Sequence, residues 1–500
     1  MKTARRTAPL LLAMLAGCTV GTDYTRPTLN APEAFATPTG DDTQLAAPGV
    51  SLSPGPIDSH SLGRWWSALN DPVLDTLIER AMKANLDLRL ASQRVLEAAA
   101  LRGIDAAGLY PTLDTRADAV RTRDSENVIR FAGAELERSR FSIGLDAAWE
   151  IDVFGRVRRT LEASDADLSA MVEDHRDVLA LVAADVARAY IEWRSYQARM
   201  DVVQSAIRAQ QETLDLTSSR FRAGLTSEVD VAQARAQLAR RQGLLPTLQI
   251  GRRTSMHRLG VLLGLAPGAL PIELDATPKV PVVTSPVATG VPSDLLSRRP
   301  DLRRAERELA AATARVGVAT ADLYPRFTLL GSIGLSSQHA GDLFEAQSLL
   351  WSMGPGVQWN LFDAGRKRAA IKAADARAAQ AMTRYERTML LALEDVENAM
   401  VSFVQLQARE RALGEAVAAD ERAVELATDR YRSGVGDFLS VLDAQRQLFD
   451  TQDLLAESRG GVGTAYVRLC KALGGGWEPP APIDPASQRA TNATDSAEAQ

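Results

Sequence analysis

The sequence has few of the residues from which metal centres, disulfides and redox sites are built. Its 500 residues include two cysteines and four histidines, too few for a disulfide framework or a zinc or iron–sulfur centre. Aromatic residues make up 5% of the chain, which suits closely packed helices better than a pocketed enzyme. No uncharged apolar run reaches about 18 residues, which excludes a helical membrane span. A net charge of −6 argues against a broad nucleic-acid surface.

Motifs of common enzymes are also missing from the sequence. The histidines are scattered without ligand spacing, and neither a GxxxxGK[ST] phosphate loop nor a Gly-x-Ser-x-Gly elbow occurs. Carboxylates are plentiful, but they lie in helical charge patterns that are typical of solvated faces. We therefore expect no enzyme activity and no cofactor.

The N-terminal residues have the pattern of a secretory signal. Residues 2–15 carry positive charges followed by a short apolar stretch, and the stretch ends in Leu-Ala-Gly-Cys18, which resembles a bacterial lipobox. We expect residues 1–17 to be a signal peptide and Cys18 to be the lipid-attachment residue. Thr19 stands where an aspartate would favour the inner membrane, so the outer membrane is the expected location. The alternative is an ordinary signal peptide that happens to contain a cysteine.

The chain contains two copies of one pattern. Landmarks recur after about 214 residues before the predicted strands and after about 210 residues behind them. The matched pairs are 109–111 with 323–325, Trp149 with Trp359, 155–156 with 365–366, Arg222 and Gly224 with Arg432 and Gly434, and 263–264 with 473–474. Ordered landmarks of this kind indicate an internal duplication. Each copy is predicted to contain a helix, paired strands, a long helix, a tight turn and a long returning helix.

Alternating apolar and polar residues mark the predicted strands. Residues 141–153 and 349–361 have a period of two that no helix produces, and 113–119 and 327–335 supply weaker partners. Such a pattern also fits a half-buried soluble sheet. In a lipidated chain, strands of this length favour a membrane-crossing hairpin. Four strands cannot close a barrel, so we expect three copies to share one of about 12 strands.

Long helical patterns follow each hairpin. They run from residue 156 to Arg222 and from residue 365 to Arg432, roughly 100 Å each at 1.5 Å per residue. Gly224 and Gly434 then reverse the chain, as glycine does at the end of a helix. A plain coiled coil would explain the periodicity but not its connection to membrane strands.

Several motifs, in order and duplicated, give the chain a specific resemblance. They are Gly-Thr-Asp-Tyr at 21–24, Trp-Trp at 65–66, Asn-Asp-Pro-Val-Leu at 70–74, Arg-Arg-Pro-Asp at 298–301, Leu-Tyr-Pro at 323–325 and Leu-Phe-Asp-Ala-Gly-Arg at 361–366. From Cys18 to about Gly474 the chain resembles the TolC-like outer-membrane factors, in the lipoprotein efflux branch of NodT type. The resemblance implies a passive homotrimeric conduit, with a 12-stranded outer-membrane β-barrel on a periplasmic α-helical barrel.

The resemblance also implies partners. These are a periplasmic adaptor protein, an inner-membrane efflux pump of the RND type and outer-membrane lipid. The pump would select the substrate among drugs, metal ions, lipids and peptides. The alternative function is a lipidated coiled-coil envelope scaffold without channel activity.

Functional residues are expected near the two turns. Asp443 and Arg446 lie one helical turn apart, whereas their repeat counterparts are Gln233 and Ala236. The resemblance implies that Asp443, Arg446 and Tyr431 hold a closed periplasmic gate. The alternative is a plain ion pair between residues three apart.

Asp230 is a weaker gate candidate, because Ser227-x-x-Asp230 is also a capping box, and Asp437 has the same ambiguity. For both, helix capping is favoured. The residues expected to touch an adaptor are those of the turns: Gly224, Leu225, Thr226, Gly434, Val435 and Gly436.

The expected fold is mainly α with transmembrane β, a duplicated helix, β-hairpin and long helical hairpin. The expected segments are the signal peptide 1–17, a lipidated extended arm 18–62, repeat 1 at 63–264 with strands at about 111–154 and its tip at about 223–226, a connector 265–292, repeat 2 at 293–474 with strands at about 325–362 and its tip at about 433–436, and a C-terminal tail 475–500.

Overall fold

The structure is a computed structural model of the chain, and it describes residues 19–30, 32–36, 52–53, 59–125, 127, 136–270, 280–283 and 287–477. The predicted signal peptide, Cys18 and residues 478–500 lie outside the described residues. The chain divides into two compact units. The sheet unit comprises Met1–Thr28, Arg94–Val172 and Arg304–Glu386, and the hairpin unit comprises Leu29–Gln93, Glu173–Arg303 and Arg387–Gln500.

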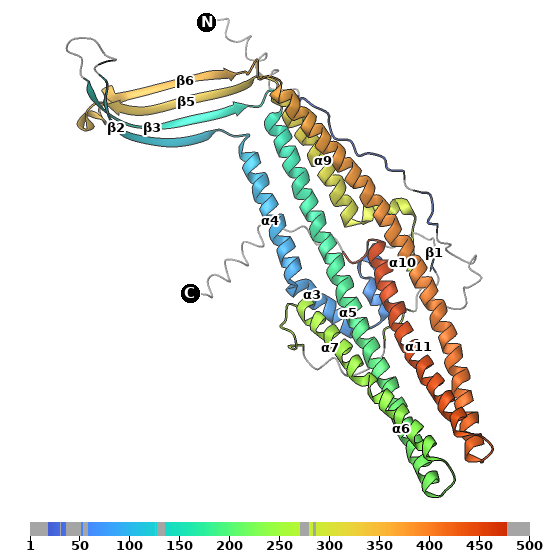
Figure 1. The fold of residues 1–500 in the computed structure, drawn as a ribbon. Helices are drawn as coiled ribbons and strands as arrows, with labels where there is room; N and C mark the ends of the chain where they lie inside the picture. Colours follow the sequence, from blue (N-terminus) through green and yellow to red (C-terminus); the bar gives the residue numbers. More distant parts are fainter. Residues whose placement is uncertain are drawn as a thin grey trace. The chain divides into compact units, whose positions relative to one another are not determined.

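Helices dominate the described residues, and two β-hairpins interrupt them (Figure 1). In chain order the main elements are α3 (Pro72–Ala84), α4 (Leu86–Ala107), β2 (Thr112–Arg123), β3 (Glu137–Ile151), α5 (Arg156–Arg222), α6 (Glu228–Gln242), α7 (Leu244–Leu262), α8 (Leu295–Arg298), α9 (Pro300–Ala321), β5 (Arg326–Ser337), β6 (Leu349–Gln358), α10 (Arg366–Arg432) and α11 (Phe438–Ala472). Short pieces are β1 (Leu52–Ser53), α2 (Ser59–Gly63) and β4 (Val287–Ala288). Within the described residues, no helix is both long and apolar enough to cross a membrane.

The duplication is visible in the element lengths. Helices α4 and α9 have 22 residues each, strands β2 and β5 have 12 each, and helices α5 and α10 have 67 each. The returning limbs differ, because α11 is continuous over 35 residues whereas repeat 1 has α6 and α7 with an interruption at Gly243. Pro246, in the first turn of α7, lacks the N–H that a continuous helix would need there.

The sheet unit contains one antiparallel four-stranded sheet of order β2-β3-β5-β6. Its central pairing joins the repeats, with Trp149 of β3 opposite Leu329 of β5. The same contact ends both hairpins: the indole Nε1 of Trp149 donates to the Leu109 carbonyl, and that of Trp359 donates to the Leu323 carbonyl, each at 3.0 Å. Strands β2 and β6 are the sheet edges.

The hairpin unit has its core where α5 packs against α11. Gly460 and Gly463 of α11 lie directly against the side chains of Ser195 and Ile191 of α5, so a Cβ at Gly460 would come within 2.5 Å of the Ser195 hydroxyl. Small residues therefore allow the helices to approach closely. Tyr190 of α5 and Tyr466 of α11 are also buried in this core.

Candidate functional site at the hairpin turns

The two hairpin turns have the same backbone. Gly224 and Gly434 adopt positive φ angles of 71° and 76°, which favour glycine. The amides of Leu225 and Val435 donate back to the carbonyls of Arg220 and Arg430, at 2.9 and 3.0 Å. Such bonds satisfy carbonyls at the end of a helix.

The predicted docking residues lie at these turns, and both turns are at the same end of the hairpin unit (Figure 1). Leu225 and Val435 are among the most exposed large apolar side chains there. Thr226 is half-buried, because its hydroxyl donates to the Asp230 carboxylate. Gly436 is also half-buried, and a Cβ there would meet the backbone of Arg430 at 3.2 Å.

Both returning helices begin with a side-chain cap, but the two capping residues exchange places. In α6 the Ser227 hydroxyl accepts from the Asp230 amide, and Asp230 accepts from the Ser227 amide, which completes a capping box. In α11 the Asp437 carboxylate accepts from the Ser440 amide at 2.7 Å. The hydrogen bond from Thr226 lowers the pKa of Asp230, and the bond from the Ser440 backbone lowers the pKa of Asp437. The capping role that the sequence favours for both aspartates is present.

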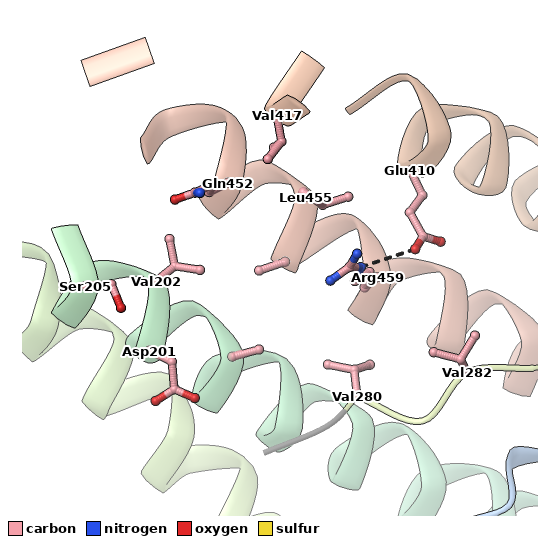
Figure 2. A pocket seen from close by; sticks show the side chains of 12 residues that line it. Asp201, Val202, Ser205, Val280, Val282, Glu410, Val417, Gln452, Leu455 and Arg459 are labelled. Carbon is pink, nitrogen blue, oxygen red and sulfur yellow. Dashed lines mark ion pairs between the residues drawn. The ribbon is translucent and has the colours of Figure 1, made fainter. Parts of the chain in front are cut away.

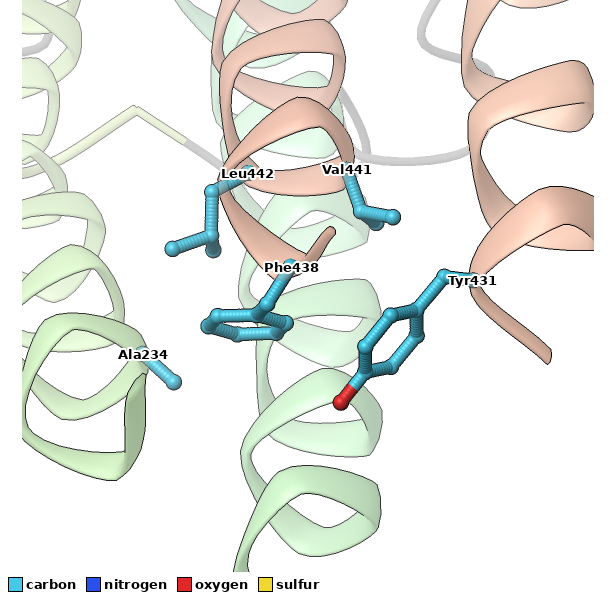
Figure 3. Packing of buried hydrophobic residues seen from close by; sticks show 5 residues of the cluster. All are labelled: Ala234, Tyr431, Phe438, Val441 and Leu442. Carbon is cyan, nitrogen blue, oxygen red and sulfur yellow. The ribbon is translucent and has the colours of Figure 1, made fainter. Parts of the chain in front are cut away.

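Tyr431 lies inside an apolar cluster and not on the surface. Figure 3 shows its ring beside Phe438, with Val441 and Leu442 of α11 and Ala234 of α6 completing the cluster. The Tyr431 and Phe438 ring centroids are 5.6 Å apart. The Tyr431 hydroxyl is buried and has no hydrogen-bond partner in the described part of the chain.

Asp443 and Arg446 form an exposed ion pair at 3.4 Å, with 70% and 55% of their side chains accessible. A pair this exposed contributes little to stability on its own. Within one chain the structure does not bring this pair together with Tyr431 in a hydrogen bond, since the tyrosine hydroxyl is unpartnered. The gate assignment of these residues remains a prediction.

Sequence analysis missed the polar contacts that join the two hairpins. Between α5 and α11, the Gln210 amide donates to Gln445 and the Gln445 amide donates to Thr213, both at 3.1 Å. Farther from the turns, Arg199 holds Asp453 with two hydrogen bonds of 2.8 and 2.9 Å. The residues of each pair are more than 230 positions apart in sequence, and no local sequence pattern predicts these contacts.

The sequence analysis also did not identify Arg220 as a residue of this site. Its guanidinium carbon lies 4.6 Å from the centroid of the Tyr431 ring, and its Nη1 donates to the Tyr431 carbonyl at 3.4 Å. The tripeptide Arg220-Phe221-Arg222 recurs as Arg430-Tyr431-Arg432, which is the one sequence signal that could have drawn attention to it.

The hairpin unit also contains a groove of about 840 Å³ between α5, α10, α11 and residues 280–283 (Figure 2). Valines from three segments line it, and Arg459 pairs with Glu410 at 3.4 Å at its edge. No set of three potential metal ligands is grouped within the described residues. Cys470 is buried, and burial raises the pKa of its thiol to about 12.

The sequence matches the family described as outer membrane efflux protein over residues 77–265 and 291–475. This chain belongs to that family. It is 32% identical over 488 residues to nodulation protein T of Rhizobium leguminosarum bv. trifolii, covering 96% of this chain and 99% of that protein. It is 33% identical over 480 residues to the toluene efflux pump outer membrane protein TtgF of Pseudomonas putida, covering 96% and 98%.

Solved structures of this family share the fold. The outer-membrane channel OprN has a TM-score of 0.83 at 36% identity, over 92% of this chain and all of that one. The open state of the Neisseria gonorrhoeae MtrE channel has a TM-score of 0.80 at 26% identity, over 92% and 98%. The family assignment predicted from the motifs is confirmed. This efflux protein is an outer-membrane channel and not an enzyme.

Proposed function

We propose that three copies of this efflux protein form one conduit, a 12-stranded outer-membrane β-barrel continued by an α-helical barrel in the periplasm. The observation that carries the proposal is the four-stranded sheet, whose strands β2 and β6 are left at its edges. Unpaired strand edges are not tolerated in lipid, because their N–H and C=O groups find no partner there. Pairing of β6 with β2 of the next copy would satisfy both edges in every copy.

Side chains on the sheet fit a lipid-facing surface. Large apolar residues are exposed on every strand, among them Leu113, Leu145, Ile333, Trp351 and Met353. In water such a surface would favour aggregation, whereas lipid accommodates it. Three sheets of four strands supply about 12 strands, enough for a closed barrel.

The oligomer can be tested on gels and in bilayers. We expect the unheated protein in mild detergent to migrate at three times the monomer mass and the heated protein at the monomer mass. Purified protein should also conduct ions in planar bilayers. A monomer that remains soluble without detergent would contradict the conduit.

We further place the partner contacts and the gate at the hairpin turns. Exposed Leu225 and Val435 offer an apolar surface to a periplasmic adaptor, which would connect the conduit to an inner-membrane pump of the RND type. Asp443, Arg446 and Tyr431, together with Asp230 in the other hairpin, would hold the tip closed until the adaptor docks. Contacts between copies would supply the closure that a single chain lacks.

The gate is tested with a matched ion pair on the same hairpin. Arg422 and Glu425 of α10 are also three residues apart and exposed, at 63% and 60% of their side chains. Asp443→Ala and Arg446→Ala are expected to raise single-channel conductance, whereas Arg422→Ala should leave it unchanged. Unchanged currents in both tip variants would remove the gate assignment and leave the conduit intact.

The N-terminal arm supports a lipid anchor at Cys18. Thr19 packs against Gly155, just after strand β3, and the Val20 amide donates to the Phe154 carbonyl at 3.2 Å. The residue that follows Cys18 therefore lies at one end of the sheet, where an acyl chain would enter the adjacent leaflet. We propose that residues 1–17 are a cleaved signal, 18–62 the lipidated arm and 265–292 the connector. Mass spectrometry of the N-terminal peptide should find acylated Cys18, and Cys18→Ala should lack the modification.

A further inference from the structure

Within the described part of the chain, one contact between the two hairpins is not repeated by the equivalent residues of the other repeat. Arg220, in the last turn of α5, stacks on the ring of Tyr431 in the last turn of α10 and donates to the Tyr431 carbonyl. Because repeat 2 follows repeat 1 at a fixed offset through the turns, the counterparts are Arg430 for Arg220 and Phe221 for Tyr431. Both counterparts are exposed.

The acceptor of this contact is present in both repeats. The Tyr431 carbonyl lies at the end of α10 and accepts from the Gly434 amide at 3.1 Å, which leaves a second lone pair for Arg220. The Phe221 carbonyl accepts from the Gly224 amide at 2.9 Å in the same way. A positive charge at this position is also favoured by the helix dipole.

The two aromatic partners, Tyr431 and Phe221, differ in exposure, but each has an aromatic face on which a guanidinium can stack. Tyr431 is 6% exposed, whereas Phe221 is 42% exposed. A phenylalanine ring attracts a guanidinium through the same quadrupole as a tyrosine ring.

In a closed ring, a neighbouring copy would supply the aromatic partner for Arg430. In a closed ring of duplicated chains, each junction from repeat 1 to repeat 2 within a chain is followed by a junction from repeat 2 to repeat 1 of the next copy. We propose that Arg430 of one copy stacks on Phe221 of the neighbouring copy and donates to its carbonyl, repeating between chains the contact that Arg220 makes within one. This inference rests on the proposed ring of three copies.

Two cysteine pairs test the contact between copies. With a short bis-maleimide reagent, Arg422→Cys with Glu425→Cys, an exposed pair three residues apart on α10, should cross-link within one chain and give only monomers on a denaturing gel. Phe221→Cys with Arg430→Cys should give covalent dimers and trimers. The parent chain gives the background, and its buried Cys470 is protected from the reagent.

The outcomes separate this contact from the ring itself. If unheated samples migrate as trimers but the 221 and 430 pair yields no intermolecular product, the contact is overturned and the conduit stands. If no trimer forms in any sample, the ring and the contact fall together. As a second measurement, Arg430→Ala should lower the temperature at which the trimer dissociates, and Arg422→Ala should not; equal dissociation temperatures would overturn the contact.

Discussion

At some equivalent positions the two repeats make the same contact with the same residue types, and at others they make it with different residue types. In repeat 1 Asp185 of α5 pairs with Arg258 of α7 at 2.9 Å, and in repeat 2 Asp395 of α10 pairs with Arg468 of α11 at 3.5 Å. Each residue is separated from its counterpart by the same offset. This ion pair within the repeat has been kept in both copies.

At a second equivalent position the two repeats carry different residues. Asn85 donates to the Leu262 carbonyl at 2.8 Å, and its counterpart Arg299 donates to the Ala472 carbonyl at 2.8 Å. Both donors satisfy the end of a returning helix, but Arg299 also binds Asp301 and Asp395. The acceptor is a backbone carbonyl, which no substitution removes, so the donor has been free to vary. The difference teaches that both repeats keep the backbone acceptor at this position while the donor is neutral in repeat 1 and charged in repeat 2.

The largest expected effect is at this position. Arg299→Ala removes a buried cation that donates to Asp301, Asp395 and the Ala472 carbonyl, and is expected to lower the free energy of unfolding by about 3 to 5 kcal/mol even though Asp395 keeps its ion pair with Arg468. Asn85→Ala should lower it by only about 1 to 2 kcal/mol, since it removes a neutral cap. Chemical denaturation in detergent measures both. Equal losses would show that the charge of Arg299 adds nothing to the cap that it shares with Asn85.

The tip aromatics give the next effect. Tyr431→Ala opens a cavity in the cluster with Phe438 and should reduce local stability by about 3 kcal/mol. Phe221→Ala, at the equivalent exposed site, should leave that cluster intact. Hydrogen exchange of the peptide 438–442 reports the difference. Similar protection of 438–442 in the two variants would show that the burial of Tyr431 does not distinguish the two turns.

The exchanged caps predict a smaller effect. Ser227→Ala removes the hydroxyl acceptor of the capping box and is expected to cost about 1 kcal/mol of local stability at the start of α6. Ser440→Ala keeps the backbone donor to Asp437 in repeat 2 and should have less effect. Hydrogen exchange in the first turn of α6 and of α11 provides the comparison. Equal loss at both turns would mean that the two caps do not depend on their different acceptors.

Acid should produce the smallest effect. The pKa values of Asp230 and Asp437 lie below the ordinary value, so their contribution to stability is present above about pH 4 and is lost as the pH falls through the lowered values. Exchange rates at the two turns, corrected for intrinsic rates, should rise in this range. Asp437→Asn keeps the cap and should remove the pH dependence at the second turn only. Unchanged pH dependence there would assign it to another group.

The periodic features of the fold could be predicted from sequence. The alternation at 141–153 indicated a strand, and the structure has β3 at Glu137–Ile151; the repeat offset indicated two long helices of equal length. The interruption at Gly243 was not expected, although Pro246 supplies its cause. The helical pattern continues on both sides of Pro246, and one missing N–H leaves no mark on that pattern.

The site could be predicted only in part. Turn glycines and caps follow from local sequence, because φ angles and side-chain acceptors act over a few residues. The burial of Tyr431 and the reach of Arg220 depend on how two hairpins more than 200 residues apart pack together. No local period carries that information. Closure of the ring adds a further level, since it depends on copies beyond one chain.

The interruption at Gly243 gives the two hairpins different mechanical properties. An unbroken helix such as α11 resists bending along its whole length and transmits rotation from one end to the other. The returning limb of repeat 1 lacks one backbone hydrogen bond at Pro246, and bending concentrates where such a bond is missing. A lateral force at the turns would therefore bend the returning limb of repeat 1 at its middle more easily than it would bend α11. Movement at the tip of repeat 2 would reach the far end of α11, where Tyr466 donates to the Trp65 carbonyl.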